Sequence, residues 1–304
     1  MNLIKVGVDK MNEFIQQLIN GISVGSIYAL IALGYTMVYG IIKLINFAHG
    51  DVYMLGAFAG LYATLVLKMS FVPALIFSMI VCAILGIIIE RLAYRPLRNS
   101  PKIVILITAI GVSLFLEYTT MFFLGPQPRA FPEVFKHASY TLLGGKVTIS
   151  NQEILIIVVT IILMLLLQYI VHNTKIGKAM RAVSYDMQAA RLMGINVDTT
   201  ISITFALGSA LAAAAGVLVG IYYNKVFPLM GIMFGLKAFV SAVLGGIGII
   251  PGAMAGGFIL GITESLVSGY GSSLYRDPVA FVILIIILLV KPSGLFGKNV
   301  REKV

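Results

Sequence analysis

The chain has 304 residues, of which 59% are hydrophobic and only 11% are charged. Soluble domains carry about 25% charged residues, so this composition excludes a water-soluble globular protein. The single cysteine, Cys82, excludes an internal disulfide. Repeated apolar windows of about 20 residues, each long enough to cross a bilayer, predict an all-α, polytopic transmembrane bundle with about eight or nine spans.

The first 17 residues, MNLIKVGVDKMNEFIQQ, contain no compact apolar segment followed by a small-residue cleavage site, so the first span is expected to stay in the mature protein. Met11 is an alternative start. The predicted spans cover residues 14–35, 52–69, 71–90, 102–123, 152–172, 200–222, 237–250, 252–268 and 279–290. They form a single membrane-embedded domain over residues 1–304, since no linker separates a second one.

Basic residues are concentrated in three of the segments between or after these spans. They are Arg91, Arg95, Arg98 and Lys102; Lys175, Lys178, Arg181 and Arg191; and Lys291, Lys298, Arg301 and Lys303. Because basic loops stay on the cytoplasmic side, the net charge of +10 indicates topology and no nucleic-acid partner.

Placing the basic loops inside puts residues 124–151 outside, where Pro126, Pro128, Pro132 and the pair Gly144 and Gly145 favour a short hairpin or an amphipathic helix. The N-terminus then lies outside if every apolar run crosses fully. It lies inside if residues 40–50 form a re-entrant segment.

Two stretches are expected to interrupt helices, INFAHGD at 45–51 and GGIGIIP at 245–251. The similar segments GAFAG (56–60) and GAMAG (252–256) follow them, which suggests an internal repeat. Transporters place their path at such breaks, where freed backbone groups face a cavity. The predicted substrate path therefore comprises Asn46, His49, Gly50 and Asp51 with Gly245, Gly246 and Gly248. Alternatively, the first stretch is a polar turn in which Asp51 caps the next helix.

Glu117 and Glu264 lie within apolar spans, where ionisable residues are functional candidates. They are interpreted as a proton relay, as partners of another helix or as interfacial groups, whereas Glu90 and Glu153 at span ends are expected to be interfacial. GISVG at 21–25 resembles a nucleophile motif but lies inside a span, so helix packing explains it better.

The sequence contains no pattern that predicts a metal site or a nucleotide site. His49, His137 and His172 lack ligand-like spacing. The chain also lacks the GxxxxGK[ST] phosphate loop, so no cofactor is expected on it.

The segment 177–194, GKAMRAVSYDMQAARLMG, interrupts the apolar pattern. Asp186 is suited to cap a two-turn helix and Gly194 to end it, and Met187 and Ala190 fall on one face with Gly194. Ala189 and Leu192 favour helix. So short a helix is unstable alone in water, so it packs against its own domain, lies on lipid headgroups or meets a soluble partner.

The longer stretch GKAMRAVSYDMQAARLMGINVDTT (177–200), followed by ITFALGSALAAAAGVLVG, resembles the cytoplasmic coupling loop, here at about residues 173–199, and the next span of ABC importer permeases. GISVGSIYALIALGYTMVYGIIKLINFAHGDVYMLGAF and AVLGGIGIIPGAMAGGFILGITE resemble the branched-chain amino acid permease family, and the NFAHGD stretch favours its LivH type.

The resemblance implies a bacterial inner-membrane permease subunit that moves leucine, isoleucine or valine. Its partners would be a second, LivM-type permease subunit, two cytoplasmic ATP-binding subunits that hold ATP and Mg²⁺, and an external solute-binding protein. The coupling residues would be Arg181, Asp186, Met187, Ala189, Ala190, Arg191, Leu192 and Gly194. The apolar face of the short helix would enter a groove on the ATPase, with Arg181 and Arg191 at its rim. The helix breaks would receive the charged ends of the amino acid.

Three alternatives remain open. The first is a permease of the same family for another amino acid, urea or a short amide. The second is an ion-coupled secondary transporter that uses Glu117 or Glu264, and the third is a membrane protein without transport activity.

Overall fold

The computed structural model describes residues 2–135, 138–142 and 146–297. Its helices are α1 (Asn2–Ile42), α2 (His49–Leu65), α3 (Phe71–Ile89) continued by the π-helical η1 (Glu90–Tyr94), α4 (Lys102–Leu124), α5 (Asn151–Asn173), α6 (Lys175–Tyr185), α7 (Met187–Leu192), α8 (Val197–Tyr223), α9 (Met230–Gly245), α10 (Ile250–Tyr270), the 3₁₀ turn η3 (Ser273–Tyr275) and α11 (Arg276–Val290). The strands β1 (Arg129–Ala130), β2 (Ser139–Leu142), β3 (Val147–Ser150) and β4 (Lys225–Val226) form the antiparallel pairs β1–β4 and β2–β3.

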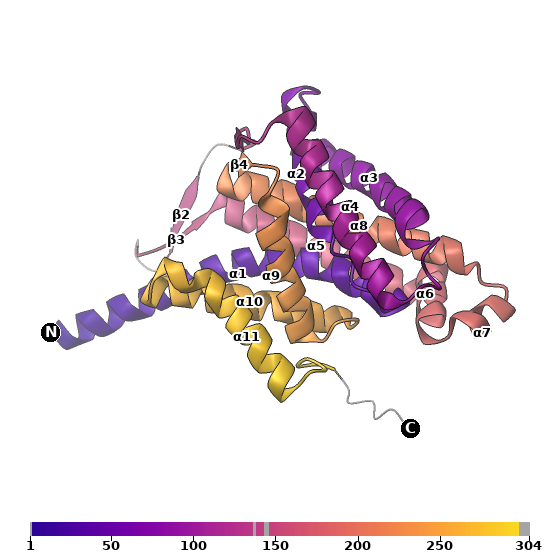
Figure 1. The fold of residues 1–304 in the computed structure, drawn as a ribbon. Coiled ribbons are helices and arrows are strands. Elements are labelled where there is room, and N and C mark those ends of the chain that lie inside the picture. The colour runs from indigo at the N-terminus through magenta and orange to yellow at the C-terminus, as the bar shows by residue number, and fades with distance from the viewer. Residues whose placement is uncertain (1, 136–137, 143–145, 298–304) are drawn as a thin grey trace.

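The predicted polytopic helical bundle is confirmed (Figure 1). Within the described residues, seven helical segments are long and apolar enough to cross a membrane. Helix α9 is apolar but has only 16 residues, and α2, with 17 residues, is also shorter than the spans. These two account for the difference from the eight or nine spans expected. The span predicted at 237–250 is misplaced, because α9 begins at Met230 and ends at Gly245.

The core is built around α8, whose residues Ala212–Ala215 are all fully buried or nearly so. Helices α1, α2 and α3 pack around it. Glycines allow this approach: a Cβ on Gly56 of α2 would lie 2.3 Å from the Cα atom of Ala213. Lipid gives helices no hydrophobic reason to associate, so such close backbone contacts hold the bundle together.

The glycines of GISVG serve the same purpose between α1 and α10, as the sequence predicts. A Cβ on Gly25 would lie 2.9 Å from the Cα atom of Phe258, and one on Gly261 would lie 2.3 Å from the backbone nitrogen of Gly25. Close packing of α1 on α10 therefore explains the glycines of this motif.

The loop predicted outside contains the hairpin β2–β3, while Gly144, Gly145 and His137 lie outside the described residues. The hairpin contacts the N-terminal part of α1: Gln16 donates to the Thr148 carbonyl at 2.9 Å and accepts from the Thr148 N–H at 2.8 Å. The other end of α1 contacts Gly248, at the break between α9 and α10. Helix α1 therefore crosses the whole bundle, and the N-terminus lies at the same end as the hairpin.

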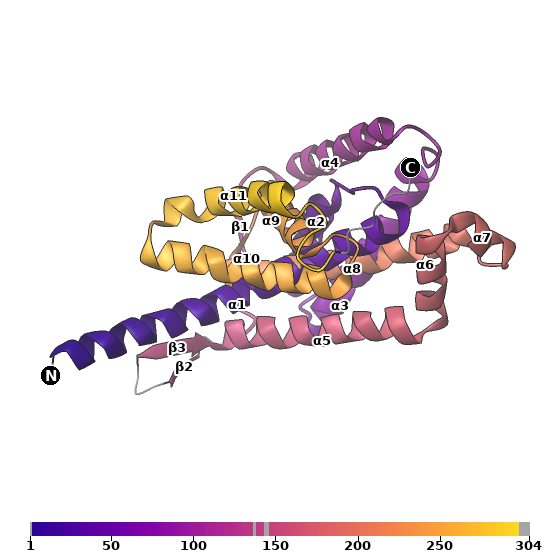
Figure 2. The same ribbon diagram turned by 90° about the horizontal axis from the view of Figure 1, so that it is seen from below.

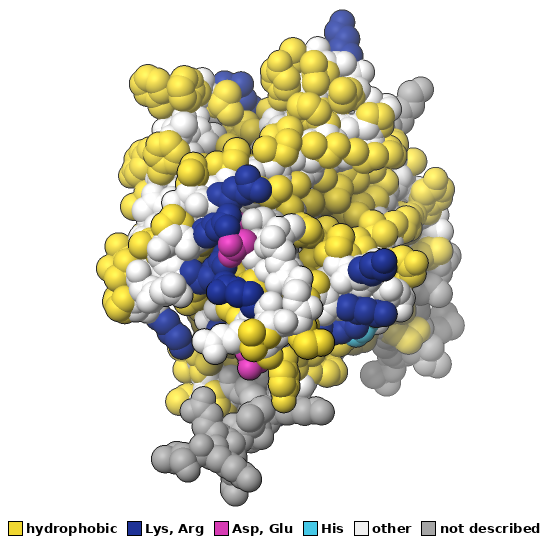
Figure 3. Space-filling model, turned by 90° about the vertical axis from the view of Figure 1, so that its right-hand side faces the viewer, with side chains coloured by type: hydrophobic (Ala, Val, Ile, Leu, Met, Phe, Trp, Pro, Cys, Tyr) yellow, Lys and Arg dark blue, Asp and Glu magenta, His cyan; other side chains and the backbone are white. Residues whose placement is uncertain are grey.

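The basic segments gather at the opposite end, which carries α6 and α7 (Figures 2 and 3). Arg95 and Arg98 form ion pairs with Asp198 at the start of α8, just after α7. Residues 294–297 return to the end of α9, where the Leu295 N–H donates to the Leu244 carbonyl at 2.8 Å. Lys298, Arg301 and Lys303 lie outside the described residues. By the positive-inside rule this end faces the cytoplasm, so we refer to the hairpin end as the outer end.

Both predicted helix breaks are present. Residues 43–48 separate α1 from α2, with Lys43 at φ 54°, and Gly246–Ile249 separate α9 from α10, with Gly246 and Gly248 at φ 109° and 95°. The alternative that Asp51 caps α2 is wrong: the N-cap is Ala48 and makes no side-chain cap bond. Asp51 lies inside the first turn, where its carboxylate accepts a hydrogen bond from the Ser113 hydroxyl on α4 at 2.5 Å.

Candidate functional site

Helices α6 and α7 project from the bundle as a short angled pair (Figure 2). The predicted cap is confirmed, because the Asp186 carboxylate accepts hydrogen bonds from the N–H groups of Gln188 and Ala189 at 2.8 and 2.9 Å. At the other end Gly194 adopts φ 80°. The Ile195 N–H donates to the Ala190 carbonyl at 3.0 Å and the Gly194 N–H to the Arg191 carbonyl at 3.1 Å. This pair of bonds is a Schellman motif, so the predicted helix end is also confirmed.

The face that α7 exposes differs from the one expected. Ala190 is 4% exposed and Met187 packs against the hydrophobic core, so the face assigned to the ATPase groove turns toward the permease itself. The apolar side chains that project outward are Tyr185, Leu192 and Met193, exposed by 95%, 89% and 82%. Helix α7 packs directly on α8, and a two-turn helix must bury its small-residue face there to be stable.

The other predicted coupling residues lie on the same projection. Ala189, Arg191 and Gly194 are exposed. Arg181 is exposed too, but its guanidinium donates to the Val171 carbonyl at the end of α5, so it fixes the angle between α5 and α6. The role of this group in ATPase coupling stays a prediction.

The residues predicted for the first part of the substrate path cluster around the start of α2. Asn46 accepts a hydrogen bond from the Tyr94 hydroxyl at 2.8 Å, and the buried His49 ring lies 4.7 Å from the Tyr35 ring. Gly50 and Asp51 line a cavity of about 150 Å³. Glu117 lines the same cavity, so the two buried carboxyl groups face one space.

The second predicted part lies elsewhere. Gly248 lines a cavity of about 100 Å³ between the end of α1 and α6. Gly245 packs tightly on Gly252, and Gly246 lies against residues 293–297. The two breaks therefore line different cavities, and their role in transport stays a prediction.

A buried ionic network at the outer end was not predicted from the sequence. Lys237 of α9 lies 2.9 Å from Glu264 of α10 and 2.6 Å from Asp277 of α11. Arg276 of α11 lies 3.1 Å from Glu264, which also accepts from the Tyr28 hydroxyl of α1 at 2.8 Å. Of the three interpretations of Glu264, pairing with another helix is confirmed. The network ties four helices together.

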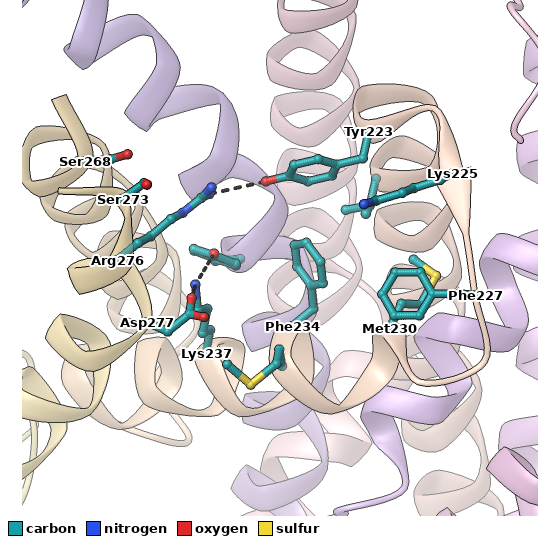
Figure 4. A pocket seen from close by; sticks show the side chains of 13 residues that line it. Tyr223, Lys225, Phe227, Met230, Phe234, Lys237, Ser268, Ser273, Arg276 and Asp277 are labelled. Carbon is teal, nitrogen blue, oxygen red and sulfur yellow. Dashed lines mark hydrogen bonds and ion pairs between the residues drawn. The ribbon is translucent and has the colours of Figure 1, made fainter. Parts of the chain in front are cut away.

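This network forms one wall of a cavity of about 360 Å³ (Figure 4). The C-terminal ends of α8 and α10, the strand β4, and the N-terminal ends of α9 and α11 surround it. Its polar lining is Tyr28, Tyr223, Lys225, Lys237, Ser268, Ser273, Arg276 and Asp277, and its apolar lining includes Val219, Phe227, Met230, Met233 and Phe234. Figure 4 shows the Arg276 side chain pointing across the cavity to Tyr223, whose hydroxyl lies 3.2 Å away.

The sequence signal for this site was weak. Lys237 falls on the first residue of a predicted span and Arg276 and Asp277 fall just before another, so all three resemble interfacial flanks. In the structure α9 begins at Met230, before the start of the predicted span, so Lys237 lies in the middle of the helix. A charged residue at such a position is costly without partners.

At the cytoplasmic end Glu90 is fully buried inside the bundle, and its expected position at the membrane interface stays a prediction. It accepts hydrogen bonds from Arg98 at 2.8 Å and from the Ser202 hydroxyl at 2.6 Å. Arg98 also bonds Asp198 at 2.6 Å. The π-helical turn at η1 carries Glu90 into the bundle, and this link joins the loop after α3 to the start of α8.

Comparison with known proteins assigns the family. Residues 17–288 match the family model described as the permease component of the branched-chain amino acid transport system. The chain belongs to the branched-chain amino acid permease family. It is therefore a multi-pass membrane protein that works as a transport subunit alongside partner subunits, and the LivH-type resemblance is confirmed.

Individual members of this branched-chain amino acid permease family match almost end to end. The high-affinity branched-chain amino acid transport system permease protein LivH of Salmonella typhimurium is 44% identical over 96% of this chain and 98% of its own length. BraD of Pseudomonas aeruginosa shows the same identity and coverage. A probable branched-chain amino acid transport permease of Methanocaldococcus jannaschii is 30% identical over 91% of this chain and 90% of its own length.

Proposed function

We propose that this chain is one of two permease subunits of an ABC importer for leucine, isoleucine and valine in the bacterial inner membrane. Two cytoplasmic subunits would bind ATP and Mg²⁺, since this sequence contains no phosphate loop. The other permease subunit would be LivM-type, and an external binding protein would deliver the amino acid. The near end-to-end similarity to LivH and BraD supports this assignment.

The observation that carries the proposal is the projection formed by α6 and α7. It extends from the basic end of the bundle and presents Tyr185, Leu192 and Met193, which are the most exposed apolar side chains of the segment. Apolar side chains grouped on a projection mark a site of protein contact. The docked ATPase would cover them, while Asp186 and Gly194 hold the helix ends and Arg191 lies at the rim.

Within the membrane, we propose that the amino acid passes the two helix breaks. Asn46, His49, Gly50 and Asp51 would line one part of its path and Gly245, Gly246 and Gly248 another. Exposed backbone groups at these breaks offer donors and acceptors to a zwitterion.

The test is uptake of radiolabelled leucine into proteoliposomes that contain the complete transporter. We expect uptake only when ATP lies on the ATPase side and the loaded binding protein lies on the other. Uptake without ATP that an ionophore abolishes would instead indicate the ion-coupled transporter, in which Glu117 or Glu264 would be the coupling residue. Uptake of urea, an amide or another amino acid in preference to leucine would indicate a permease of the same family with that other substrate.

A further inference from the structure

The cavity next to the Lys237–Glu264 network has the composition of a small-molecule site. Its volume of about 360 Å³ lies at the lower end of the range of about 300–1,000 Å³ that is usual for ligand pockets. Such pockets combine a mostly apolar wall with a few fixed polar groups. Here the polar groups come from α1, α8, β4, α9, α10, η3 and α11, and the apolar wall comes largely from α9.

The charged groups are arranged in two layers. Glu264 and Lys237 form the buried layer, with side chains exposed by 0% and 6%. Arg276 and Asp277 form the layer that reaches the cavity, with side chains exposed by 31% and 52%. The buried layer holds the outer one in place, because Glu264 pairs with Arg276 and Lys237 pairs with Asp277.

Opposite charges on neighbouring residues suit a ligand that itself carries both charges. A guanidinium has five N–H donors, and the contacts of Arg276 with Glu264 and Tyr223 occupy two of them. Its remaining donors and the Lys225 ammonium at the rim can receive a carboxylate. The Asp277 carboxylate can accept from an ammonium group.

The apolar wall opposite these charged groups determines which side chain of the ligand fits. Met230, Met233 and Phe234 of α9 contribute with Val219 and Phe227. Thioether side chains are flexible and adapt to differently branched apolar groups. A charged group on the side chain of the ligand would lie against this apolar wall without a partner, which is costly.

We infer that this cavity is a binding site for the zwitterion of a free aliphatic amino acid. Arg276 and Lys225 bind the α-carboxylate, Asp277 binds the α-ammonium group, and Met230, Met233 and Phe234 contact the side chain. The site lies at the outer end, where an amino acid released by the external binding protein would enter. This inference rests on the proposed function and names the first position of the substrate in the permease.

The chain offers a direct test because its single cysteine, Cys82, is fully buried. In the purified complete transporter, Met233→Cys introduces a thiol into the cavity wall, and its rate of reaction with a small methanethiosulfonate reagent is measured. Leu274→Cys is the matched control, since Leu274 is 83% exposed at the same end and does not line the cavity.

We expect millimolar leucine to slow labelling of the Met233→Cys variant at least several-fold and to leave the Leu274→Cys variant unchanged. Neither 4-methylpentanoate, which lacks the ammonium group, nor lysine should protect. Adding Asp277→Asn should weaken protection by leucine by about ten- to one-hundred-fold in concentration, as expected for loss of a charged hydrogen-bond partner.

Equal labelling with and without leucine, or equal protection by 4-methylpentanoate, would overturn the inference. ATP-driven leucine uptake is measured on the unsubstituted transporter, so the two proposals fail separately. Protection without ATP-driven uptake would contradict the proposed function alone, whereas ATP-driven uptake without protection would contradict this site alone.

Discussion

The buried ionic network predicts a specific pattern of stability. Changing Lys237→Met removes the cation that lies 2.9 Å from Glu264, whose side chain is 0% exposed, and 2.6 Å from Asp277. Breaking a buried ion pair from one side costs about 3–5 kcal/mol, because an uncompensated charge stays buried. Glu264 keeps Arg276 as a partner at 3.1 Å, so we expect a loss at the lower end of that range, about 3 kcal/mol.

The double variant Lys237→Met with Glu264→Gln removes one charge of each sign. Arg276 and Asp277 then remain as the charged pair, and the glutamine side chain can still accept from Tyr28. Replacing both partners of a buried pair is often close to neutral. We therefore expect the double variant to recover more than half of the lost stability, which is a coupling energy of about 2 kcal/mol.

The assay is thermal unfolding of the purified transporter in detergent, followed by size-exclusion chromatography with fluorescence detection. Lys225→Met is the control, since Lys225 is exposed at the cavity rim and forms no part of the network. A double variant as unstable as Lys237→Met would show that the two side chains do not stabilise each other, and a single variant as stable as the control would show that Lys237 contributes nothing to stability.

Three further predictions concern the cytoplasmic end. Gly194→Val places a β-branched residue at φ 80° with open space around it, so we expect about 1–2 kcal/mol of local strain and less leucine transported per ATP hydrolysed. The control Gly111→Val, also in open space but without positive φ, should transport normally. Equal coupling of transport to ATP hydrolysis in both variants would count against the proposed role of Gly194. Leu192→Asp and Met193→Asp should each reduce co-purification of the ATPase subunit, whereas Tyr140→Asp on the outer hairpin should not; retention of the ATPase by both α7 variants would contradict the docking surface. Arg98→Ala should lower the stability by about 3 kcal/mol because Glu90 stays buried without its cation. Arg95→Ala removes only a surface ion pair with Asp198 and should cost below about 1 kcal/mol. Similar melting temperatures for the two variants would show that the ion pair between Arg98 and Glu90 does not stabilise the bundle.

The fold was predictable where the chemistry is local. Apolar length identifies the spans, the basic loops identify one end of the bundle, and Asp186 and Gly194 mark the ends of α7 because capping depends on nearby residues. The helix breaks at residues 43–48 and 246–249 were equally visible, because glycine and polar residues interrupt apolar runs there.

The sites were less predictable because they depend on contacts between distant segments. Lys237, Glu264 and Arg276 come from three helices, and only their packing makes a network of them. The prediction of which face α7 exposes was wrong for the same reason. Helical spacing groups Met187 with Ala190, but the position of α8 decides that this face turns inward and that Leu192 faces out.

In the proposed transporter, α7 is the contact through which a separate ATPase drives this permease. The most direct test places the photo-crosslinker p-benzoylphenylalanine at Leu192 in a transport-active complex, with Tyr140 of the outer hairpin as the control position. We expect a cross-link from position 192 to the ATPase subunit and none from position 140. An active complex in which position 192 yields no cross-link to the ATPase would contradict it.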